Sequence, residues 1–498
     1  MRTKKVILNF LSDALPQIII MFLGIFKIKI FLTYLGNDSL GLYQLFGKLF
    51  IYLSLLEGGI AVAGLTRLYK PVSENNNTKI NEILSAIKII FKYIAFGMII
   101  LGIFLSFFIP YMIKDNSFSN IYIQGTFILF LIMNIWSYFA TANKLIFEAN
   151  QRNYIINNIY QPLNILKSIL EIIVVLMNFG LIGIIIVNLV LNIIINIIIV
   201  LKSKKDYALN LNNKKKDFSM LTDVKHLLVY KISGMVDYNL DILIISSMMG
   251  LKSVVIYSTY NYIIESIKQF SEKVAYAVQS SFGNLLSKEI NRGYQVFMEF
   301  NSFSFYVGTI ICVPLLFSIN PFINIWYEGK ILTSMVLAIL FCLILFYMII
   351  HIPLTVMVNA LRIFKEAKTS TIMETVSNLI LSIVLVNYFG IAGALLGTII
   401  SMILFEYIGR SYVIIKNQFN EKMIKYNLNN LLYLLIASIS IIICYFVNKN
   451  LVYDDLFSWF SNSCLLGIIS FITVSILYKL TNNVGFFDRL CRTFRKKR

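Results

Sequence analysis

The sequence predicts an all-α polytopic membrane protein with about 14 transmembrane helices, built as two parallel six-helix lobes plus two C-terminal helices. Three observations predict this fold class: an apolar composition, a series of long apolar runs and an internal repeat. Of the 498 residues, 58% are hydrophobic and 14% are charged, and the mean hydropathy is +0.77. Soluble chains are nearer half apolar and a quarter charged, so this composition excludes a soluble enzyme and a disordered protein.

Long apolar runs follow one another along the whole chain. A helix needs about 20 apolar residues to cross the hydrocarbon core of a bilayer. Suitable runs cover residues 9–35, 40–65, 84–109, 120–143, 154–177, 181–201, 226–249, 254–282, 299–320, 331–359, 371–388, 391–415, 429–447 and 458–479. The first run is too long for the core of a signal peptide and no small-residue cleavage site follows it, so we expect it to be a retained span.

Basic residues are concentrated in alternate connections between these runs. The connections after even-numbered runs, together with both termini, hold 31 Lys and Arg, whereas those after odd-numbered runs hold 4. Cytoplasmic loops carry such an excess, so both termini are expected in the cytoplasm. The net charge of +19 is then a topology signal that faces anionic membrane lipids, and no nucleic-acid partner is expected.

The connections also suggest a division into domains. We expect an N-lobe over 1–201, a basic cytoplasmic linker over 202–223, a C-lobe over 224–416, two further helices over 417–480 and a basic cytoplasmic tail over 481–498. The linker is the longest connection and carries six lysines between residues 202 and 216. The tail mixes phenylalanines with arginines, which suits either an interfacial basic helix or a disordered positive anchor.

Similar short segments recur at an offset near 210 residues. Asn178–Gly183 resembles Tyr388–Gly393, with the glycines 210 apart, and Gly36–Tyr43 matches Gly250–Tyr257 at its Gly, Ser and Tyr with an offset of 214. Two single-residue pairs follow the same order, namely Arg152 with Arg362 and Pro110 with Pro321. An even number of spans separates the copies, so the lobes are expected to be parallel. Such repeats are typical of alternating-access transporters that bind substrate between their halves.

Ionisable residues inside the spans cost roughly 2.5–3.5 kcal/mol each on insertion scales and so need a reason. Helical spacing collects them into stripes, which are Asp13, Gln17, Gly24 and Lys27; Lys231, Gly234, Asp237, Tyr238 and Asp241; and Tyr257, Asn261, Glu265, Lys268 and Glu272. Lys27 and Lys48 each lie about 12 Å below the outer surface at 1.5 Å per residue. A mixed-charge cavity shared by the first, second, seventh and eighth spans is therefore expected.

The chemistry of this cavity has two readings. Cationic Lys27, Lys48 and Lys268 suit a phosphate-bearing ligand. Carboxylates in the same space suit proton or sodium coupling. The alternative is structural, because Lys268 could pair with Glu265 or Glu272, and Lys167 with Glu171, at helical spacing.

Motifs for metal, cofactor or ATP chemistry are absent. The five cysteines are scattered, and neither His226 nor His351 has a partner at metal-ligand spacing, so both are interpreted as core or interfacial histidines. Gly41–Leu49 departs from a phosphate-binding loop in spacing and in its last residue. We expect no cofactor, with energy coming from a Na⁺ or H⁺ gradient. Gly393 and Gly397 form a GxxxG motif, interpreted as a helix-packing contact.

The N-terminal stretch adds a family resemblance. Thr33–Gly36, Gly41–Tyr43 and Leu55–Ile60, followed by Arg67, resemble the opening of polysaccharide flippases, the Wzx-type members of the multidrug/oligosaccharidyl-lipid/polysaccharide (MOP) exporter superfamily. This local match covers about the first 70 residues, and the fourteen spans extend it across the chain. Where the family often has Asp, this chain has Glu57, which keeps the acidic function.

The resemblance implies a fold, a function and a site. The lobes would form a V whose cavity is lined by the first, second, seventh and eighth spans. Lys27, Lys48 and Lys268 would hold the diphosphate or acidic sugar of an undecaprenyl-diphosphate-linked oligosaccharide, and Asp237, Asp241, Glu265 and Glu57 would serve coupling or sugar contacts. The protein would be a transporter of the bacterial cell membrane that works without ATP and beside polysaccharide polymerase machinery.

Two other functions were weighed against the flippase. A multidrug cation antiporter of the same superfamily would favour a cavity dominated by carboxylates, which the three lysines argue against. A membrane-embedded polymerase or glycosyltransferase would need a large outer loop or a soluble catalytic domain. No outer connection exceeds roughly a dozen residues, so a transporter rather than an enzyme is expected.

Overall fold

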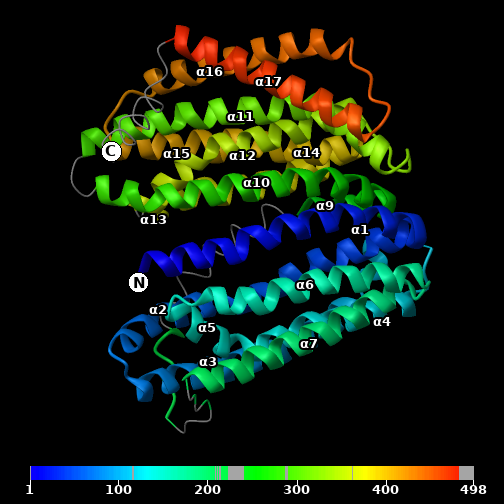
Figure 1. Cartoon of the computed structure of the whole chain (residues 1–498), viewed down its shortest axis with the longest axis vertical. Coiled ribbons are helices and arrows are strands. Elements are labelled where there is room, and N and C mark those ends of the chain that lie inside the picture. Colours follow the sequence, from blue (N-terminus) through cyan, green and yellow to red (C-terminus); the bar gives the residue numbers. More distant parts are fainter. Residues whose placement is uncertain are drawn as a thin grey trace. The chain divides into compact units, whose positions relative to one another are not determined.

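A computed structural model describes residues 2–114, 117–207, 209, 211, 215–221, 240–286, 290–361 and 363–481 (Figure 1). The predicted features outside these ranges include His226, Arg362, most of the basic tail and the stripe residues Lys231, Gly234, Asp237 and Tyr238. Every regular element in the described part of the chain is helical, which confirms the all-α class. The chain folds as two compact units, Met1–Val255 and Ile256–Arg498.

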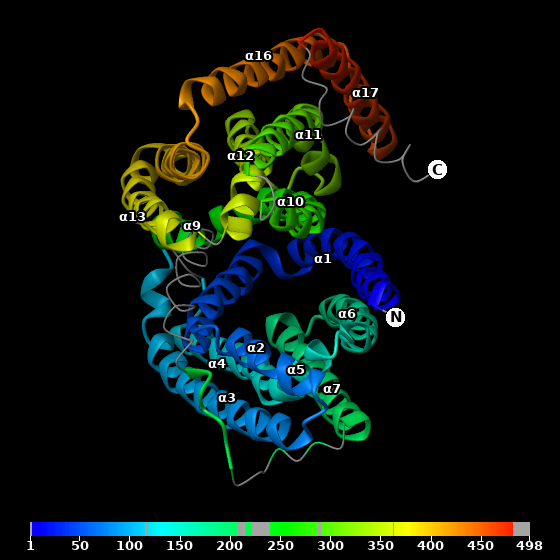
Figure 2. The same ribbon diagram turned by 90° about the vertical axis from the view of Figure 1, so that its left-hand side faces the viewer.

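The first unit is a bundle of long helices with short connections. Its elements are α1 (Arg2–Leu53), η1 (Ser54–Glu57), α2 (Ile60–Ser73), α3 (Asn77–Ser106), η2 (Ile109–Met112), α4 (Asn120–Ile135), η3 (Trp136–Ala140), α5 (Thr141–Ala149), α6 (Asn153–Leu176), α7 (Gly180–Tyr207) and α9 (Leu240–Met249). Helix α6 packs between α1 and α7, and α4 packs between α3 and α7 (Figures 1 and 2). These helices are apolar on most of their surface. Neighbouring helices cover part of each apolar surface, and the remainder faces outward.

Glycines at the repeat positions share an unusual backbone. Gly36 has φ +79°, which breaks α1 into two helices, and its repeat partner Gly250 has φ +85° at the start of α10. Gly180 and Gly390, the second repeat pair, have φ +64° and φ +57°. L side chains rarely adopt these values, so the sequence repeat corresponds to four backbone positions that favour glycine. The repeat is therefore a feature of the folded chain as well as of its sequence.

The second unit is built around α11. Its elements are α10 (Leu251–Leu286, whose first turn belongs to the first unit), α11 (Ile290–Trp326), α12 (Met335–Leu361), α13 (Phe364–Phe389), α14 (Ile391–Ser401), the π-helical η4 (Met402–Tyr407), α15 (Ile408–Tyr412), the π-helical η5 (Val413–Gln418), α16 (Met423–Asn448) and α17 (Leu456–Leu480). Helix α11 packs against α12, α16 and α17, so the two C-terminal helices join this unit (Figure 2).

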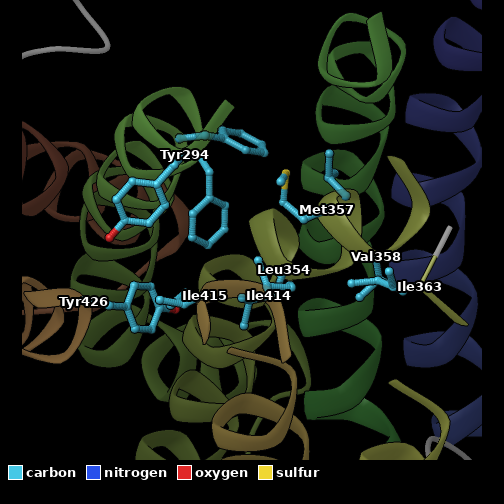
Figure 3. Close-up of a cluster of buried hydrophobic side chains, with 11 residues drawn as sticks. Tyr294, Leu354, Met357, Val358, Ile363, Ile414, Ile415 and Tyr426 are labelled. Carbon is cyan, nitrogen blue, oxygen red and sulfur yellow. The ribbon is translucent and has the colours of Figure 1, made fainter. Parts of the chain in front are cut away.

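A dense apolar cluster holds α11, α12, η5 and α16 together at one end. Figure 3 shows Tyr294 of α11 and Tyr426 of α16 beside Leu354 and Met357 of α12, with Ile414 of η5 between the helices. Leu354, Met357, Ile414 and Tyr426 are fully buried. Burying side chains of this size contributes about 1.5–3 kcal/mol each, so this cluster fixes the end of the unit where η5 meets α16.

Eleven helices in the described part of the chain are long and apolar enough to cross a membrane, which identifies a multi-pass membrane protein. They account for twelve of the predicted spans, because the first two lie together in Ile19–Glu57. The predicted seventh span is represented by the ten residues of α9, since residues 222–239 are outside the description. The predicted eighth span is α10. This helix is long enough to span a membrane but is not among the eleven apolar helices, because it carries the polar stripe.

The GxxxG motif is a packing contact, as predicted. A Cβ atom on Gly393 would collide with the backbone carbonyl of Leu385, and one on Gly397 would lie 2.7 Å from the backbone nitrogen of Ser382. The glycines therefore let α14 approach the backbone of α13 closely, which small residues do in membrane proteins.

Candidate functional site

An ion pair lies between helices of the first unit. The Lys27 Nζ atom of α1 is 2.8 Å from Glu171 Oε2 of α6, and Asn188 Nδ2 of α7 donates to Glu171 Oε1 at 2.6 Å. The Glu171 side chain is 1% exposed and that of Lys27 is 24% exposed. A buried carboxylate needs such partners, and both of its oxygens have one here. Helices α1, α6 and α7 thus meet at one carboxylate.

The same group carries excess positive charge. Lys167, one turn before Glu171 on α6, is half-buried and interacts electrostatically with both Glu171 and Lys27. Among the described side chains of this group, two ammonium groups therefore face one carboxylate. Glu171 also acts on the buried Tyr43 hydroxyl of α1, which interacts with Asn188 as well. The described ionisable side chains of this group are thus two lysines and one glutamate.

The other predicted residues of the first unit lie on separate elements. Lys48 is half-buried on the second half of α1, beyond the break at Gly36. Glu57 is half-buried at the end of η1 and acts electrostatically on Tyr138 of η3. Asp241 is 6% exposed on α9, which packs against α1. The structure thus brings α9 to α1, the helix that holds the predicted first span and the start of the second.

Lys268 and Glu265 form the predicted structural pair of the second unit. The Lys268 Nζ atom lies 3.3 Å from Glu265 Oε1, one turn away on α10. Their side chains are 14% and 30% exposed. The pairing at helical spacing is thus present, and the partial exposure leaves both groups accessible. Lys167 differs from this pattern, because the carboxylate of Glu171 is hydrogen-bonded by Lys27 of a different helix.

A second buried network surrounds Glu406 in η4. Arg410 Nη2 of α15 lies 2.7 Å from Glu406 Oε1, and the Tyr347 hydroxyl of α12 donates to Glu406 Oε2 at 2.8 Å. His351 of α12 lies between the charges, with Nε2 3.9 Å from Glu406 Oε1 and 3.4 Å from Arg410 Nη1. His351 and Glu406 are both 6% exposed. His351 is therefore buried, as predicted, but it belongs to an ionisable network.

A polar seam also joins α13 to α14. Asn378 Oδ1 accepts from the Ser382 and Thr398 hydroxyls at 2.9 and 3.4 Å, and all three residues are buried. Glu374 lies one turn from Asn378 and is 1% exposed. The close approach at Gly397 allows these short side chains to meet. No cluster of three or more His, Cys, Asp or Glu with metal-binding geometry occurs among the residues that the structure covers.

Ion pairs between side chains outside the predicted spans anchor the basic linker on α3. Asp217 Oδ2 lies 2.8 Å from Lys79 Nζ, and the Asp217 backbone nitrogen donates to the Glu82 carbonyl at 3.3 Å. Lys215 Nζ lies 3.7 Å from the Glu82 carboxylate. The Lys79 ammonium, followed by hydrogen bonds from Ser219, lowers the pKa of Asp217 to about 2. The linker thus has a fixed attachment point at the N-terminal end of α3.

Two parts of these networks were not predicted as site residues. Glu171 was predicted only as a structural partner of Lys167 on its own span, because the helix that carries Lys27 beside it is not visible in a single sequence. Glu406 and Arg410 stand four residues apart inside the apolar run 391–415. Opposite charges at this spacing within a span were a usable signal, since ionisable residues at membrane depth mark functional sites.

These features define a class of fold before any comparison. An all-helical multi-pass chain with a structural repeat and ionisable groups among its helices has the architecture that alternating-access transporters use. No protein-family model and no curated protein sequence matches the chain.

Solved structures do match it. Lipid II flippase MurJ in an inward closed conformation has a TM-score of 0.71 at 18% identity, over 96% of this chain and 99% of its own. An inward-facing multidrug resistance MATE transporter of the MOP superfamily has a TM-score of 0.60 at 15% identity, over 81% and 98%. Its outward-facing form gives 0.55 at 14%, over 81% and 95%. The chain therefore has the fold that these lipid II flippase and MATE transporter structures share.

Proposed function

We propose that this protein is a flippase that moves undecaprenyl-diphosphate-linked oligosaccharide repeat units across the bacterial cytoplasmic membrane for surface polysaccharide biosynthesis. It does so by alternating access without ATP, with both termini in the cytoplasm. The substrate would serve an O-antigen, a capsule or a teichoic-acid-like polymer, and the polysaccharide polymerase machinery would receive it. The V-shaped pair of lobes would be 1–201 and 224–416.

The observation that carries this proposal is the extent of the structural match. The lipid II flippase covers 96% of the chain, whereas the MATE transporters cover 81%. Helices α16 and α17 lie beyond two copies of a six-helix lobe, and a match over nearly the whole chain includes them. A lipid-linked substrate has a long apolar tail and an anionic head, so it needs both extra apolar surface and cationic side chains.

The cationic residues support the head-group assignment. Lys27 and Lys48 of α1, with Lys268 of α10, are proposed to hold the diphosphate or an acidic sugar. The local excess of one positive charge around Lys27 and Lys167 favours an anionic ligand there. Because Lys27 is already bound to Glu171, a diphosphate would have to share or displace that partner, which makes its binding reversible.

The acidic residues are proposed to serve coupling or sugar contacts. Asp237, Asp241, Glu265 and Glu57 are the members of this set. Carboxylates accept hydrogen bonds from sugar hydroxyls when ionised and take up protons when desolvated. Coupling to Na⁺ or H⁺ would supply the energy, so no bound cofactor is required.

The second candidate is a cation-coupled multidrug antiporter of the MATE type. The TM-score of 0.60 to such a transporter supports it. An antiporter for cationic drugs would bind them with carboxylates, and the positive excess near Lys27 is unfavourable for that ligand. We therefore favour the flippase.

Deleting the gene tests the choice between them. The flippase predicts that polyprenyl-diphosphate oligosaccharides accumulate in the cytoplasmic leaflet and that one surface polysaccharide is lost. Normal lipid intermediates together with altered sensitivity to cationic drugs would instead support the antiporter. Complementation with a Lys27→Ala, Lys48→Ala variant tests the site, and export at the parental level by this variant would contradict it. Lys29→Ala, two residues along α1 and about 200° around the helix, is the matched control.

A further inference from the structure

The network around Glu406 can hold its charges in two arrangements, one with His351 neutral and one with His351 protonated. In the arrangement observed, Arg410 Nη1 lies 3.4 Å from His351 Nε2. An arginine nitrogen only donates hydrogen bonds, so Nε2 must present its lone pair. The other ring nitrogen, Nδ1, lies 3.2 Å from the Thr355 hydroxyl and carries the proton of the neutral ring. The tautomer is thus assigned from the hydrogen-bond partners.

Adding a proton to His351 is incompatible with this arrangement. The new N–H would point at the guanidinium of Arg410, so two cationic donors would face each other. The acceptor available to a protonated Nε2 is Glu406 Oε1, 3.9 Å away, which Arg410 already holds at 2.7 Å. Protonated His351 and Arg410 would therefore both donate to one carboxylate oxygen while their charges lie 3.4 Å apart. Repulsion between the two cations disfavours this, so binding of one to Glu406 favours displacement of the other.

The surrounding helix can accommodate such a movement. Arg410 lies in the five-residue α15, between the π-helical segments η4 and η5. Single π-helical turns in α-helices occur frequently at functional sites. Arg410 Nη2 also donates to the Thr371 hydroxyl of α13 at 3.0 Å, and the neighbouring Gly409 lies against Ser370 of the same helix. Releasing Arg410 would therefore loosen the contact between α13 and α15.

The charges around His351 come from several elements. Helix α12 contributes the Tyr347 hydroxyl, α13 contributes the buried Glu374 one turn from Thr371, and α14 carries no charged residue. Helix α10 contributes Lys268, whose charge acts on Glu406 and which is paired with Glu265. Helices α11 and α16 contribute tyrosines, with Tyr306 and Tyr433 in one cluster and Tyr426 donating to the Tyr407 hydroxyl of η4. His351 is the group here whose ordinary pKa lies nearest neutrality.

We propose that His351 binds the proton that drives transport, with Glu406 as its counter-ion and Arg410 as the internal cation that holds Glu406 when the proton has left. This role of His351 extends the proposed transport function and rests on it, because a proton can drive transport only if the protein is a transporter. A proton fits better than Na⁺, because a guanidinium already occupies the carboxylate and an imidazole is a poor sodium ligand. The positions 210 residues earlier in the first unit are Thr141, Asn196 and Val200, which do not titrate.

The chain offers a direct test, because it contains two histidines. His226→Gln leaves His351 as the single histidine of the full-length protein. With ¹⁵N-labelled histidine in lipid nanodiscs, NMR reports the tautomer and protonation of this ring from pH 8 to pH 5. Arg410→Met removes the competing cation, and Lys416→Met removes an exposed cation from the same helical segment as a matched control.

The expected result is a neutral Nδ1–H ring at pH 8 and a proton affinity at least tenfold higher in the Arg410→Met protein than in the Lys416→Met control. Equal titration in these two proteins, or a ring that stays neutral in both down to pH 5, would overturn the proposal. The titration uses no substrate, so it remains readable if the flippase assignment is wrong.

The link to transport has a separate measurement. Proteoliposomes with a fluorescent polyprenyl-diphosphate oligosaccharide are given a pH gradient of either sign. The parent protein should move the lipid faster with one sign of gradient, and His351→Asn should remove that difference. A gradient effect that persists in a folded His351→Asn protein refutes the coupling role. Failure of the parent to move the lipid counts against the flippase and leaves the titration result standing.

Discussion

Replacing Lys27 by Met is expected to lower the free energy of unfolding by about 3 kcal/mol, because it leaves a buried carboxylate without its cation. The Lys27 and Glu171 charges lie 2.8 Å apart, which corresponds to about 6 kcal/mol of attraction at an effective dielectric constant of 20. Desolvation offsets part of this, and breaking buried pairs costs about 3–5 kcal/mol in practice. We take the lower end because Asn188 still donates to Glu171 in the variant.

Glu171→Gln should cost less, about 1–2 kcal/mol, because Lys27 is 24% exposed and can be hydrated. The double variant removes both charges, so its loss should be smaller than the sum of the single losses by about 1–3 kcal/mol. Equilibrium unfolding in mixed detergent micelles measures all four proteins, with Lys29→Met as the control on the same helix. Additivity of the two single losses within about 0.5 kcal/mol would refute the reasoning, since residues in contact must couple.

The same four proteins separate stability from ligand binding. If Lys27 serves only to neutralise Glu171, the double variant, which lacks both charges, should fold and export polysaccharide at the parental level. If Lys27 also binds the diphosphate, the double variant should fold and still fail to export. Membrane abundance and export are therefore measured on the same cells. The proposed binding role is excluded if the double variant exports normally.

Three further predictions concern the backbone and the linker. The Lys79 ammonium holds the folded pKa of Asp217 at about 2, below the ordinary aspartate value of about 3.9. The ion pair therefore stabilises linker docking above about pH 4 and is lost as the pH falls through 2. Pepsin should cleave the linker increasingly over that range, and Asp217→Asn should remove the pH dependence. Gly36→Ala should cost about 1–3 kcal/mol in unfolding free energy because of its positive φ, whereas Gly47→Ala, in open helical space, should not destabilise. Gly397→Ala should cost about 1–3 kcal/mol by crowding α13, whereas Gly467→Ala, with nothing within 4 Å, should be nearly neutral; thermal unfolding compares each pair.

The helices were predictable because their signal is local. A long apolar run specifies a membrane helix by its length and composition, and neither depends on which neighbour it packs against. The repeat was predictable because positive φ restricts the residue type, so Gly36 and Gly250 are visible in the sequence as matched glycines. The break in α1 was predictable for the same reason, because Gly36 and the polar residues Asn37–Ser39 separate the apolar runs 9–35 and 40–65.

The site was predictable only as a set of ionisable residues. Helical phase gave the stripe that contains Lys27 but not its partner, since Glu171 comes from a helix 144 residues later. The pair Lys268 and Glu265 was visible because both residues lie on one helix at a spacing of three. Partners on one helix are thus readable from a sequence, whereas partners on different helices need the packing of the bundle.

The two repeat copies keep a common backbone and carry different chemistry. Their glycines adopt matching positive φ values, so both halves need the same chain breaks. The first unit places Lys27 on its buried carboxylate, Glu171. The second unit places Arg410 and a titratable histidine beside Glu406. Divergence of this kind would allow one half to respond to the head group of a substrate and the other to respond to protons, with a shared architecture converting both into the same helix movements.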